Sequence, residues 1–503
     1  MHVAIRCLIA FVVLGVGSVG GVGNAMERPP NILFFFVDDM GWQDTSVEFH
    51  SKATLLNRDY RTPNMKKLAS QGLRFTNAYA CSICSPSRVS LMTGQNAARH
   101  KVTCWTLRKD TSPARPGKQY SPANWNLNGL QPAGDKTQRS VAEVSLPELL
   151  RAGGYRTIHA GKGHFGAQGT PGANPLNLGF DVNIAGSYMG GPGSYHGDHN
   201  FSAAWRGGGT IWDVPGLDKY HGQTINLTEA ITREAIRAVE KSVADKAPFY
   251  LYMSHYAVHA PFEPDRRFLP NYEDSNWNQH KKKYASMIES MDKSLGDLLE
   301  TIDRLGVAKE TIVIFMSDNG SPRNNPRNLP LRGHKISGYE GGNRVPLIVN
   351  WPGVTAEGKR NATPVIIEDI FPTILELARL DVPDNDGQSW VPILEGNSPP
   401  PEIPRELLWH YPNFYDQPPY SSLRHGDWKL IYWHQNQSFE LFNLVTDIGE
   451  TTNVAQENPD RLRDMATRLD QQLKDKNAQF ATIKATGKPI PYPLEALSSR
   501  IEN

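Results

Sequence analysis

The sequence has almost no excess of charge: 53 Lys and Arg residues face 52 Asp and Glu residues, and the formal net charge is +1. This balance gives no basis for binding nucleic acid or for a general attraction to membranes. After the N-terminus, no apolar run is long enough to cross a bilayer, which argues against stable membrane association. The sequence also has no internal repeat. Because the net charge is close to zero, the charge of a ligand must be balanced by particular side chains at its binding site.

Cysteine is scarce as well, with four residues in the chain: Cys7, Cys81, Cys84 and Cys104. Cys7 falls in an N-terminal segment that we expect to be removed. Cys81 and Cys104 either pair in an oxidising compartment or remain two buried thiols, and the sequence leaves both interpretations open.

The N-terminal segment, residues 1–25, resembles a secretory signal peptide. Arg6 comes early, an apolar stretch follows from residue 8 to about residue 16, and small residues lead to Ala25. We expect cleavage of this segment and a secreted or periplasmic protein, and we favour a bacterial origin. A retained N-terminal anchor is the alternative.

The whole chain is long enough to bury a large core, since it has 503 residues and 39% of them are apolar. Short apolar runs typical of strands covered on both faces lie at 31–37, 157–160, 249–253, 311–316 and 345–349. Helical stretches lie at 65–71, 145–152, 227–243, 284–305 and 368–379. This alternation predicts an α/β fold with a large, mixed but mostly parallel sheet sandwiched by helices.

The pattern changes after a Pro-rich link at 398–404. Short strand-like pieces follow at 407–409, 422–424, 428–433 and 438–442, and then an amphipathic helix at 459–476. They predict a smaller C-terminal unit of antiparallel sheet with a closing helix. We therefore expect a signal peptide (1–25), a main domain (26–398) and a C-terminal subdomain (399–503).

The segment Cys84-Ser-Pro-Ser-Arg88 predicts the start of a short helix. Pro86 suits the first turn and Gly94 suits the end. Cys84 then lies at the helix N-terminus, where free N–H groups favour an anion, and Arg88 points back toward it from the same face. From these residues alone, a nucleophile at an anion site and a buried Cys beside a structural Arg are equally good interpretations.

Acidic and amide groups follow the two most apolar strands, as Asp38-Asp39 and Asp318-Asn319. The carboxyl ends of parallel strands meet at one edge of a sheet, where sites form. Three carboxylates and one amide oxygen make an oxygen-only set suited to Ca²⁺ or Mg²⁺ rather than Zn²⁺. The alternative is that each pair only begins a polar loop.

Residues 83–94 resemble the formylglycine motif of type I sulfatases, a family of the alkaline phosphatase superfamily. The motif reads Cys-x-Pro-x-Arg, two variable residues, two apolar residues and Thr-Gly. The resemblance implies a maturation enzyme that oxidises Cys84 to formylglycine, whose hydrate is the nucleophile and is anchored by Arg88. It implies one Ca²⁺ held by Asp38, Asp39, Cys84, Asp318 and Asn319.

Further segments resemble the same family, over residues 31 to about 453. In Gly-Lys-Gly-His, Lys162 would contact a sulfate oxygen and His164 would act as donor or base. His259, just ahead of Ala-Pro, would be the site histidine, and Lys335 the active-site lysine. The implied catalytic set is Cys84, Arg88, Lys162, His164, His259, Lys335 and Asp318. The resemblance also implies an alkaline-phosphatase-like fold, with His255 either behind the site residues or in the core.

The general appearance is closest to bacterial arylsulfatase A-like polysaccharide sulfatases, which implies a sulfated carbohydrate as substrate. Side chains in expected loops that suit a sugar are Trp105, His196, His199, Trp205, Trp212, His410, Tyr411 and Arg424. Of these we select His410 and Arg424 as substrate-binding residues. The Gly-rich region 186–209 is expected to form loops at the mouth of the site.

Three functions are compatible with this pattern. We favour a sulfuric ester hydrolase that acts on a sulfated carbohydrate. A phosphonate or phosphodiester hydrolase of the same superfamily, which shares the motif, is the alternative. A glycan-binding protein that keeps Cys84 as a thiol is the third, and the presence of nucleophile, metal ligands and proton donor together argues against it.

Overall fold

A computed structural model describes residues 28–323, 328–397 and 404–501. The expected signal peptide and the expected domain boundary at residue 398 lie outside these ranges. Both therefore stay predictions. Within the described ranges, no helix combines the length and the apolar composition that a membrane crossing requires.

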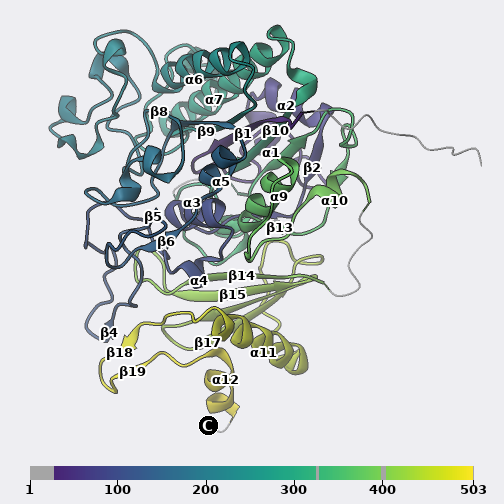
Figure 1. Ribbon diagram of the computed structural model, residues 1–503. Coiled ribbons are helices and arrows are strands. Elements are labelled where there is room, and N and C mark those ends of the chain that lie inside the picture. Colours follow the sequence, from purple (N-terminus) through teal and green to yellow (C-terminus); the bar gives the residue numbers. More distant parts are fainter. Residues whose placement is uncertain (1–27, 324–327, 398–403, 502–503) are drawn as a thin grey trace, which may run out of the picture.

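A central sheet of eight strands organises the main body (Figure 1). Its strand order is β12 (Arg360–Asn361), β2 (Leu73–Phe75), β11 (Leu347–Asn350), β10 (Thr311–Ser317), β1 (Asn31–Val37), β9 (Phe249–Ser254), β7 (Arg156–Gly161) and β8 (Val182–Ile184). β1 pairs in parallel with β10 and β9, and β7 pairs in parallel with β9 and β8. β11 is antiparallel to both of its neighbours. The predicted mixed, mostly parallel sheet is confirmed.

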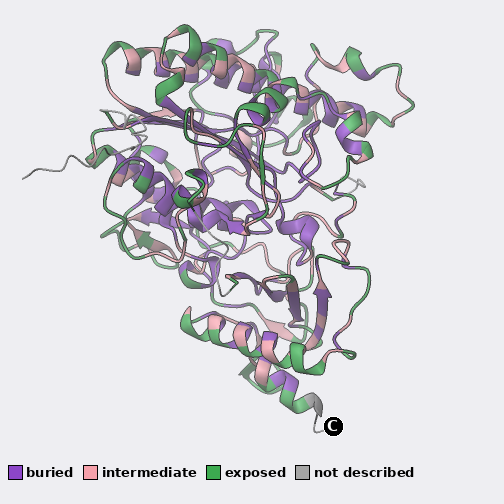
Figure 2. Cartoon of the chain, turned by 90° about the vertical axis from the view of Figure 1, so that its right-hand side faces the viewer, coloured by how far each residue is buried: buried purple, intermediate pink, exposed green. Residues whose placement is uncertain are grey.

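The sheet separates two hydrophobic cores. Along β1, Ile32, Phe34 and Phe36 face one core, and the residues between them face the other. On the first side lie α3 (Cys84–Thr93), α5 (Leu146–Ala152) and α9 (Ile370–Leu377). On the second side lie α2 (Pro63–Gln71), α6 (Leu227–Ala244) and α7 (Gln279–Arg304). Figure 2 shows the buried strands between helices whose outer faces are exposed. A strand buried on both faces explains the continuous apolar run of β1.

The C-terminal part forms a four-stranded antiparallel sheet below the main body in Figure 1. Its strands are β14 (Glu406–Tyr411), β15 (Tyr420–His425), β16 (Trp428–Trp433) and β17 (Ser438–Asn443), followed by α11 (Pro459–Asp475) and α12 (Pro493–Ile501). On one face, Trp409 and Ile431 join the first core of the main body, and on the other, Leu408 and Leu430 pack against the helices. The predicted small antiparallel sheet with a closing helix is confirmed.

Shorter elements complete the fold. They are α1 (Leu55–Asp59), β3 (Ala78–Tyr79), α4 (Ala97–His100), β4 (Tyr120–Ser121), β5 (Leu130–Pro132), β6 (Val141–Glu143), α8 (Glu340–Asn343), β13 (Val365–Ile366), α10 (Val391–Leu394), β18 (Thr482–Ile483) and β19 (Lys488–Pro489). The three described cysteines, Cys81, Cys84 and Cys104, are separate buried thiols. The structure therefore adopts the unpaired alternative for Cys81 and Cys104.

A buried carboxyl in the single turn that precedes α9 makes the free energy of unfolding depend on pH. Burial raises the pKa of Glu368 to about 8, whereas a Glu in an unfolded chain titrates at about 4.3. One of its oxygens accepts a hydrogen bond from Asn96, and the other has no partner among the described residues. The neutral form is thus the form that the fold accommodates. The contribution of neutral Glu368 to the free energy of unfolding is complete below the pKa that the residue has in the unfolded chain. It is lost as the pH rises toward 8.

We therefore expect Glu368→Gln to flatten the fall in unfolding free energy between about pH 5 and pH 8. Within this window the unfolding free energy of the variant should rise, relative to that of the wild type, by at most about 1.4 kcal/mol for each pH unit. Urea denaturation at pH 5 and pH 8 measures the difference. Glu376→Gln, at an exposed position of α9, is the matched control. Parallel pH profiles for wild type and Glu368→Gln would contradict the assignment.

Candidate active site

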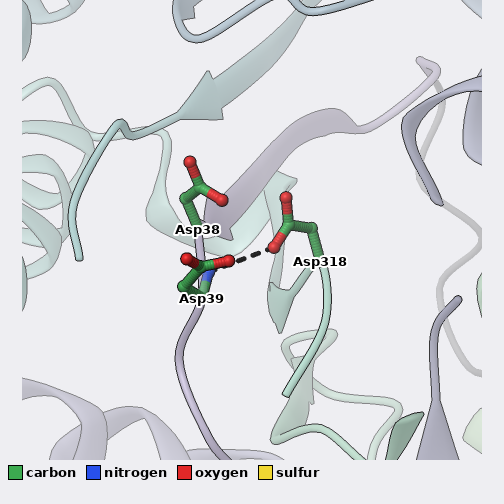
Figure 3. A group of neighbouring side chains, drawn as sticks. All are labelled: Asp38, Asp39 and Asp318. Atoms are coloured by element: carbon green, nitrogen blue, oxygen red, sulfur yellow. Dashed lines mark hydrogen bonds between the residues drawn. The ribbon is translucent and has the colours of Figure 1, made fainter. Parts of the chain in front are cut away.

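The candidate site lies at the carboxyl ends of β1 and β10. The parallel register pairs Val37 with Ser317, so the acidic residues that follow each strand lie side by side. Asp38, Asp39 and Asp318 each bring one carboxylate oxygen within 4.8 Å of the others, and all three are buried (Figure 3). The backbone N–H of Asp39 donates to Asp318 Oδ1 at 3.1 Å. The predicted meeting of the two strand ends is confirmed.

This cluster fits a hard divalent cation. Asp38 Oδ1 and Asn319 Oδ1 are buried and have no hydrogen-bond partner among the described residues. Burial and the neighbouring Asp318 raise the pKa of Asp38 well above its ordinary value. A bound cation would use the free oxygens as ligands and would reduce the repulsion between the carboxylates. A set of ligands made only of oxygen atoms suits Ca²⁺ or Mg²⁺.

Two lysines border the carboxylates. Lys162, after β7, places Nζ 2.6 Å from Asp38 Oδ2, and both side chains are fully buried. Lys335 places Nζ 2.5 Å from Asp39 Oδ1. Burial acts to lower the pKa of Lys335, but Asp39 and other nearby acids raise it above the ordinary value, so the ammonium form persists. Two ammonium groups thus flank a carboxylate cluster, which suits an anionic ligand held beside a cation.

Cys84 begins α3, as the sequence predicted. Pro86 lies in the first turn, and Gly94 ends the helix in the left-handed region at φ 67°. Cys84 is 3% exposed, and burial raises the pKa of its thiol, an effect that Lys162 and Lys335 oppose. A protonated thiol is a poor nucleophile, so unmodified Cys84 is a weak reagent at neutral pH.

Arg88 connects the helix to three strand ends. Its Nε and Nη2 donate to Asp318 Oδ2 at 3.1 and 2.8 Å. Its Nη1 donates to the Lys162 carbonyl at 3.1 Å and to Ser254 Oγ, at the end of β9, at 2.6 Å. The side chain is fully buried. Arg88 therefore positions Asp318 and the N-terminus of α3. The sequence did not predict its additional contact with Ser254.

Two histidines face the cluster in their neutral forms. His259 Nε2 lies 3.8 Å from Asp39 Oδ2, and burial together with Lys335 lowers the pKa of His259 to about 4. Its Nδ1 is 2.8 Å from the Ala260 carbonyl, so Nδ1 carries the proton. His164 Nε2 is 2.7 Å from the Thr106 carbonyl, which assigns its proton to Nε2. His164 Nδ1 is buried and free of partners within the described chain. His255 is buried and bonds Ser294 at 2.8 Å, in the core, one of its two expected positions.

The Gly-rich region passes directly over these rings. A Cβ at Gly190 would lie 2.6 Å from a ring carbon of His164, and one at Gly191 would lie 2.7 Å from His259 Nδ1. Larger residues would therefore displace the histidines. In the same loop, Tyr195 Oη donates to the His259 carbonyl at 2.9 Å. The prediction that this region borders the site is confirmed, while Tyr195 had no recognisable signal in the sequence.

The two residues selected for substrate binding lie elsewhere. His410 is on β14 and Arg424 on β15, not in loops. Both ring nitrogens of His410 are used, one by Ser421 Oγ and one by the Gln479 carbonyl, each at 2.8 Å. Arg424 is 5% exposed and donates to Tyr79 Oη and to a backbone carbonyl. The expectation that both residues lie in loops was wrong, because both are on paired strands of the C-terminal sheet. Their assignment to substrate binding stays a prediction.

Comparison with known proteins adds to this geometry. A family model described as Sulfatase matches residues 30–380, and one described as N-sulphoglucosamine sulphohydrolase, C-terminal, matches residues 334–479. The human protein named N-acetylgalactosamine-6-sulfatase is 30% identical over 462 residues, which cover 88% of this chain and 78% of that protein. A Formosa agariphila protein named Sulfatase is 27% identical and covers 93% of each chain.

A solved structure has a similar fold along nearly the whole chain. It is described as Ps i-CgsB in complex with k-i-k-neocarrahexaose, with a TM-score of 0.72 and 27% identity. The alignment covers 94% of this chain and 98% of that one. The similarity therefore extends through the main body and the C-terminal sheet.

Proposed function

The chain belongs to the sulfatase family, and we propose that it removes sulfate from a sulfated carbohydrate, with formylglycine made from Cys84 as its nucleophile and one Ca²⁺ as its metal. The observation that carries the proposal is the convergence of Cys84, the carboxylate cluster and two ammonium groups at one buried point. The names of the relatives, one a hexosamine sulfatase and one solved with an oligosaccharide, support a carbohydrate substrate.

The metal would be held by Asp38, Asp39, Asp318 and Asn319 beside position 84. Ca²⁺ would supply positive charge for the sulfate oxygens during transfer. Formylglycine would be made by a maturation enzyme that oxidises the –CH₂SH of Cys84 to –CHO, and its hydrate would supply two hydroxyls on one carbon. One would be the nucleophile toward sulfur, with the sugar alcohol as leaving group, and loss of the proton of the other would release sulfate and restore the aldehyde. We also propose that residues 1–25 direct the chain out of the cytoplasm, in agreement with such substrates.

The protein side chains divide the remaining work. Lys162 and Lys335 would neutralise the charge that develops on the transferring group. His164 Nδ1 has a free lone pair, which suits it to accept a proton from the nucleophile. His259 Nε2, which carries no proton in the form described above, would take one up when the anionic substrate binds beside Lys335 and would pass it to the departing alcohol. Arg88 would keep Asp318 and the helix N-terminus in place.

We expect His259→Ala to reduce kcat unequally for two substrates. A sugar alkoxide needs a proton to leave, so turnover of a sulfated sugar should fall by about 10²–10³-fold. 4-Nitrophenolate leaves without one, so turnover of 4-nitrophenyl sulfate should fall by less than about tenfold. His425→Ala, at the end of β15, is the matched control. An equal loss on both substrates would contradict the role of His259 as the acid.

The reaction class is tested with the protein produced together with a formylglycine-generating enzyme. We expect hydrolysis of 4-nitrophenyl sulfate and of sulfated mono- and disaccharides in the presence of calcium, and much slower hydrolysis of bis(4-nitrophenyl) phosphate. Faster turnover of the phosphate diester would favour the phosphodiesterase alternative. Absence of turnover on every substrate, with formylglycine present at position 84, would refute the proposal.

A further inference from the structure

A cavity of about 680 Å³ opens in the loops between β8 and α6, which project from the main body in Figure 1. Its volume falls in the range of about 300–1,000 Å³ that is usual for ligand sites. The residues that line it and enter the argument are Asp198, His199, Ser202, Trp205, Asp213 and Asp218. None of them belongs to the carboxylate cluster.

The loop that forms this cavity is fixed to the candidate active site. Ser194 Oγ and the backbone N–H of Tyr195 both donate to Glu263 Oε2, at 2.6 and 2.7 Å. Glu263 lies four residues after His259, and Tyr195 also holds the His259 carbonyl. His199 Nδ1 is 3.1 Å from Ser194 Oγ. The cavity and the catalytic histidine therefore belong to one hydrogen-bonded unit, so a chain bound at one is placed relative to the other.

Trp205 gives the cavity a flat apolar wall. Its side chain is 51% exposed, and it is the one exposed aromatic residue among the described parts of the chain. The ring stacks on His199, with centroids 4.3 Å apart and planes 18° apart. An indole held rigid by a stacked partner, with apolar surface left in water, suits the C–H face of a sugar ring.

Carboxylates make the rest of the cavity lining polar and negatively charged, in contrast to the apolar face of Trp205. Asp213 Oδ1 is buried and lacks a hydrogen-bond partner within the described residues. Asp198 is paired with Arg266 at 2.7 Å, whereas no described cation lies within ion-pair distance of Asp213 or Asp218. Carboxylate oxygens accept hydrogen bonds from hydroxyl groups and repel a sulfate group. The lining therefore favours hydroxyls and disfavours anions.

We propose that this cavity is a sugar-binding subsite that takes an uncharged, unsulfated sugar unit of the same carbohydrate whose sulfate the active site removes. Trp205 is the stacking surface, and Asp213 accepts from the sugar hydroxyls. The proposal rests on the proposed function for the identity of the substrate. It adds a rule on substrate charge, called the charge rule below: the enzyme acts best on a carbohydrate that places an unsulfated unit in this cavity.

Direct binding tests the subsite without turnover. The full-length Cys84→Ala variant is applied to an array of neutral, partly sulfated and fully sulfated oligosaccharides. We expect binding to glycans that carry an unsulfated unit, and a loss of about tenfold when Trp205→Ala is added. Trp428→Ala, which changes a partly exposed Trp on β16, is the matched control and should bind like the parent. Identical binding by the Trp205 variant, or no glycan binding by the parent, would overturn the proposal.

A separate binding experiment tests the charge rule. Asp213→Asn should raise relative binding to glycans that are sulfated at every unit, because one repelling charge is gone. An unchanged ratio of sulfated to unsulfated binding would overturn the rule. If the wild type fails to hydrolyse aryl or sugar sulfates, the proposed function fails, whereas the binding result judges the subsite alone.

Discussion

Replacing Cys84 by Ala should lower kcat for sulfate ester hydrolysis by on the order of 10⁵-fold or more, because a nucleophile and the reaction path that depends on it are lost together. The position is buried at the N-terminus of α3, within reach of the charges of the carboxylate cluster and its two lysines. The lysines, histidines and metal ligands remain, so binding should survive. Turnover of 4-nitrophenyl sulfate, with the KM of the residual activity, measures the effect.

Cys81→Ala is the matched control for this loss. Cys81 is also buried, and burial raises the pKa of its thiol beyond the range of neutral pH. Its replacement should cost stability through a small cavity and should leave kcat within about twofold, because the side chain contacts Ser90 rather than the cluster. Comparable losses in the two variants would mean that general damage to α3, and not a missing nucleophile, explains the result.

The second large effect concerns the metal. Asp38→Asn keeps the shape of the side chain but removes a charge from the cluster, so kcat should fall by on the order of 10³-fold through weakened transition-state stabilisation. Calcium at a hundredfold excess over its Kd should stabilise the wild type by about 2.7 kcal/mol. The variant should lose most of this stabilisation. Thermal unfolding with calcium and with a chelator measures it.

The chelated state of the same variant gives a sharper criterion. In chelator the amide relieves repulsion from Asp318 but leaves buried Lys162 without its ion-pair partner, so the calcium response of each protein is measured from its own chelated baseline. Asp245→Asn, at a surface position paired with Lys241, should respond to calcium like the wild type. A calcium response that persists in Asp38→Asn would place the ion elsewhere.

Local signals explain why much of the site was predictable from the sequence. Pro86 and Gly94 mark the ends of α3 through backbone preferences of single residues, and the structure reproduces both. The apolar runs of β1 and β10 identify buried strands, and parallel pairing then brings Asp38 and Asp318 together. These inferences needed only neighbouring residues and one rule of sheet geometry.

Pairing between distant segments explains what the sequence did not reveal. The antiparallel direction of β11 depends on its partners β10 and β2, and nothing in its own residues encodes it. His410 was assigned to a loop because the strand-like piece before it, 407–409, is short, and Arg424 was counted with the loop residues although it ends the piece 422–424. The strands extend to Glu406–Tyr411 and Tyr420–His425, and their pairing takes both side chains into the interior.

The role of Arg88 shows the same limit at a finer scale. Its position four residues after Cys84 predicted an anchor for the helix end. Its bonds to Ser254 and to the Lys162 carbonyl join residues 166 and 74 positions away in the chain. Such a junction exists only once the sheet has formed, so helix spacing could not indicate it.

A crystal structure of the matured protein grown with calcium tests whether position 84 and the carboxylate cluster form one reaction centre. We expect a single Ca²⁺, at about 2.3–2.6 Å from side-chain oxygens of Asp38, Asp39, Asp318 and Asn319. We also expect a carbonyl or its hydrate, in place of a thiol, at position 84 beside the ion. An intact thiol there in protein that hydrolyses sulfate esters, or calcium bound away from these four residues, would contradict this expectation.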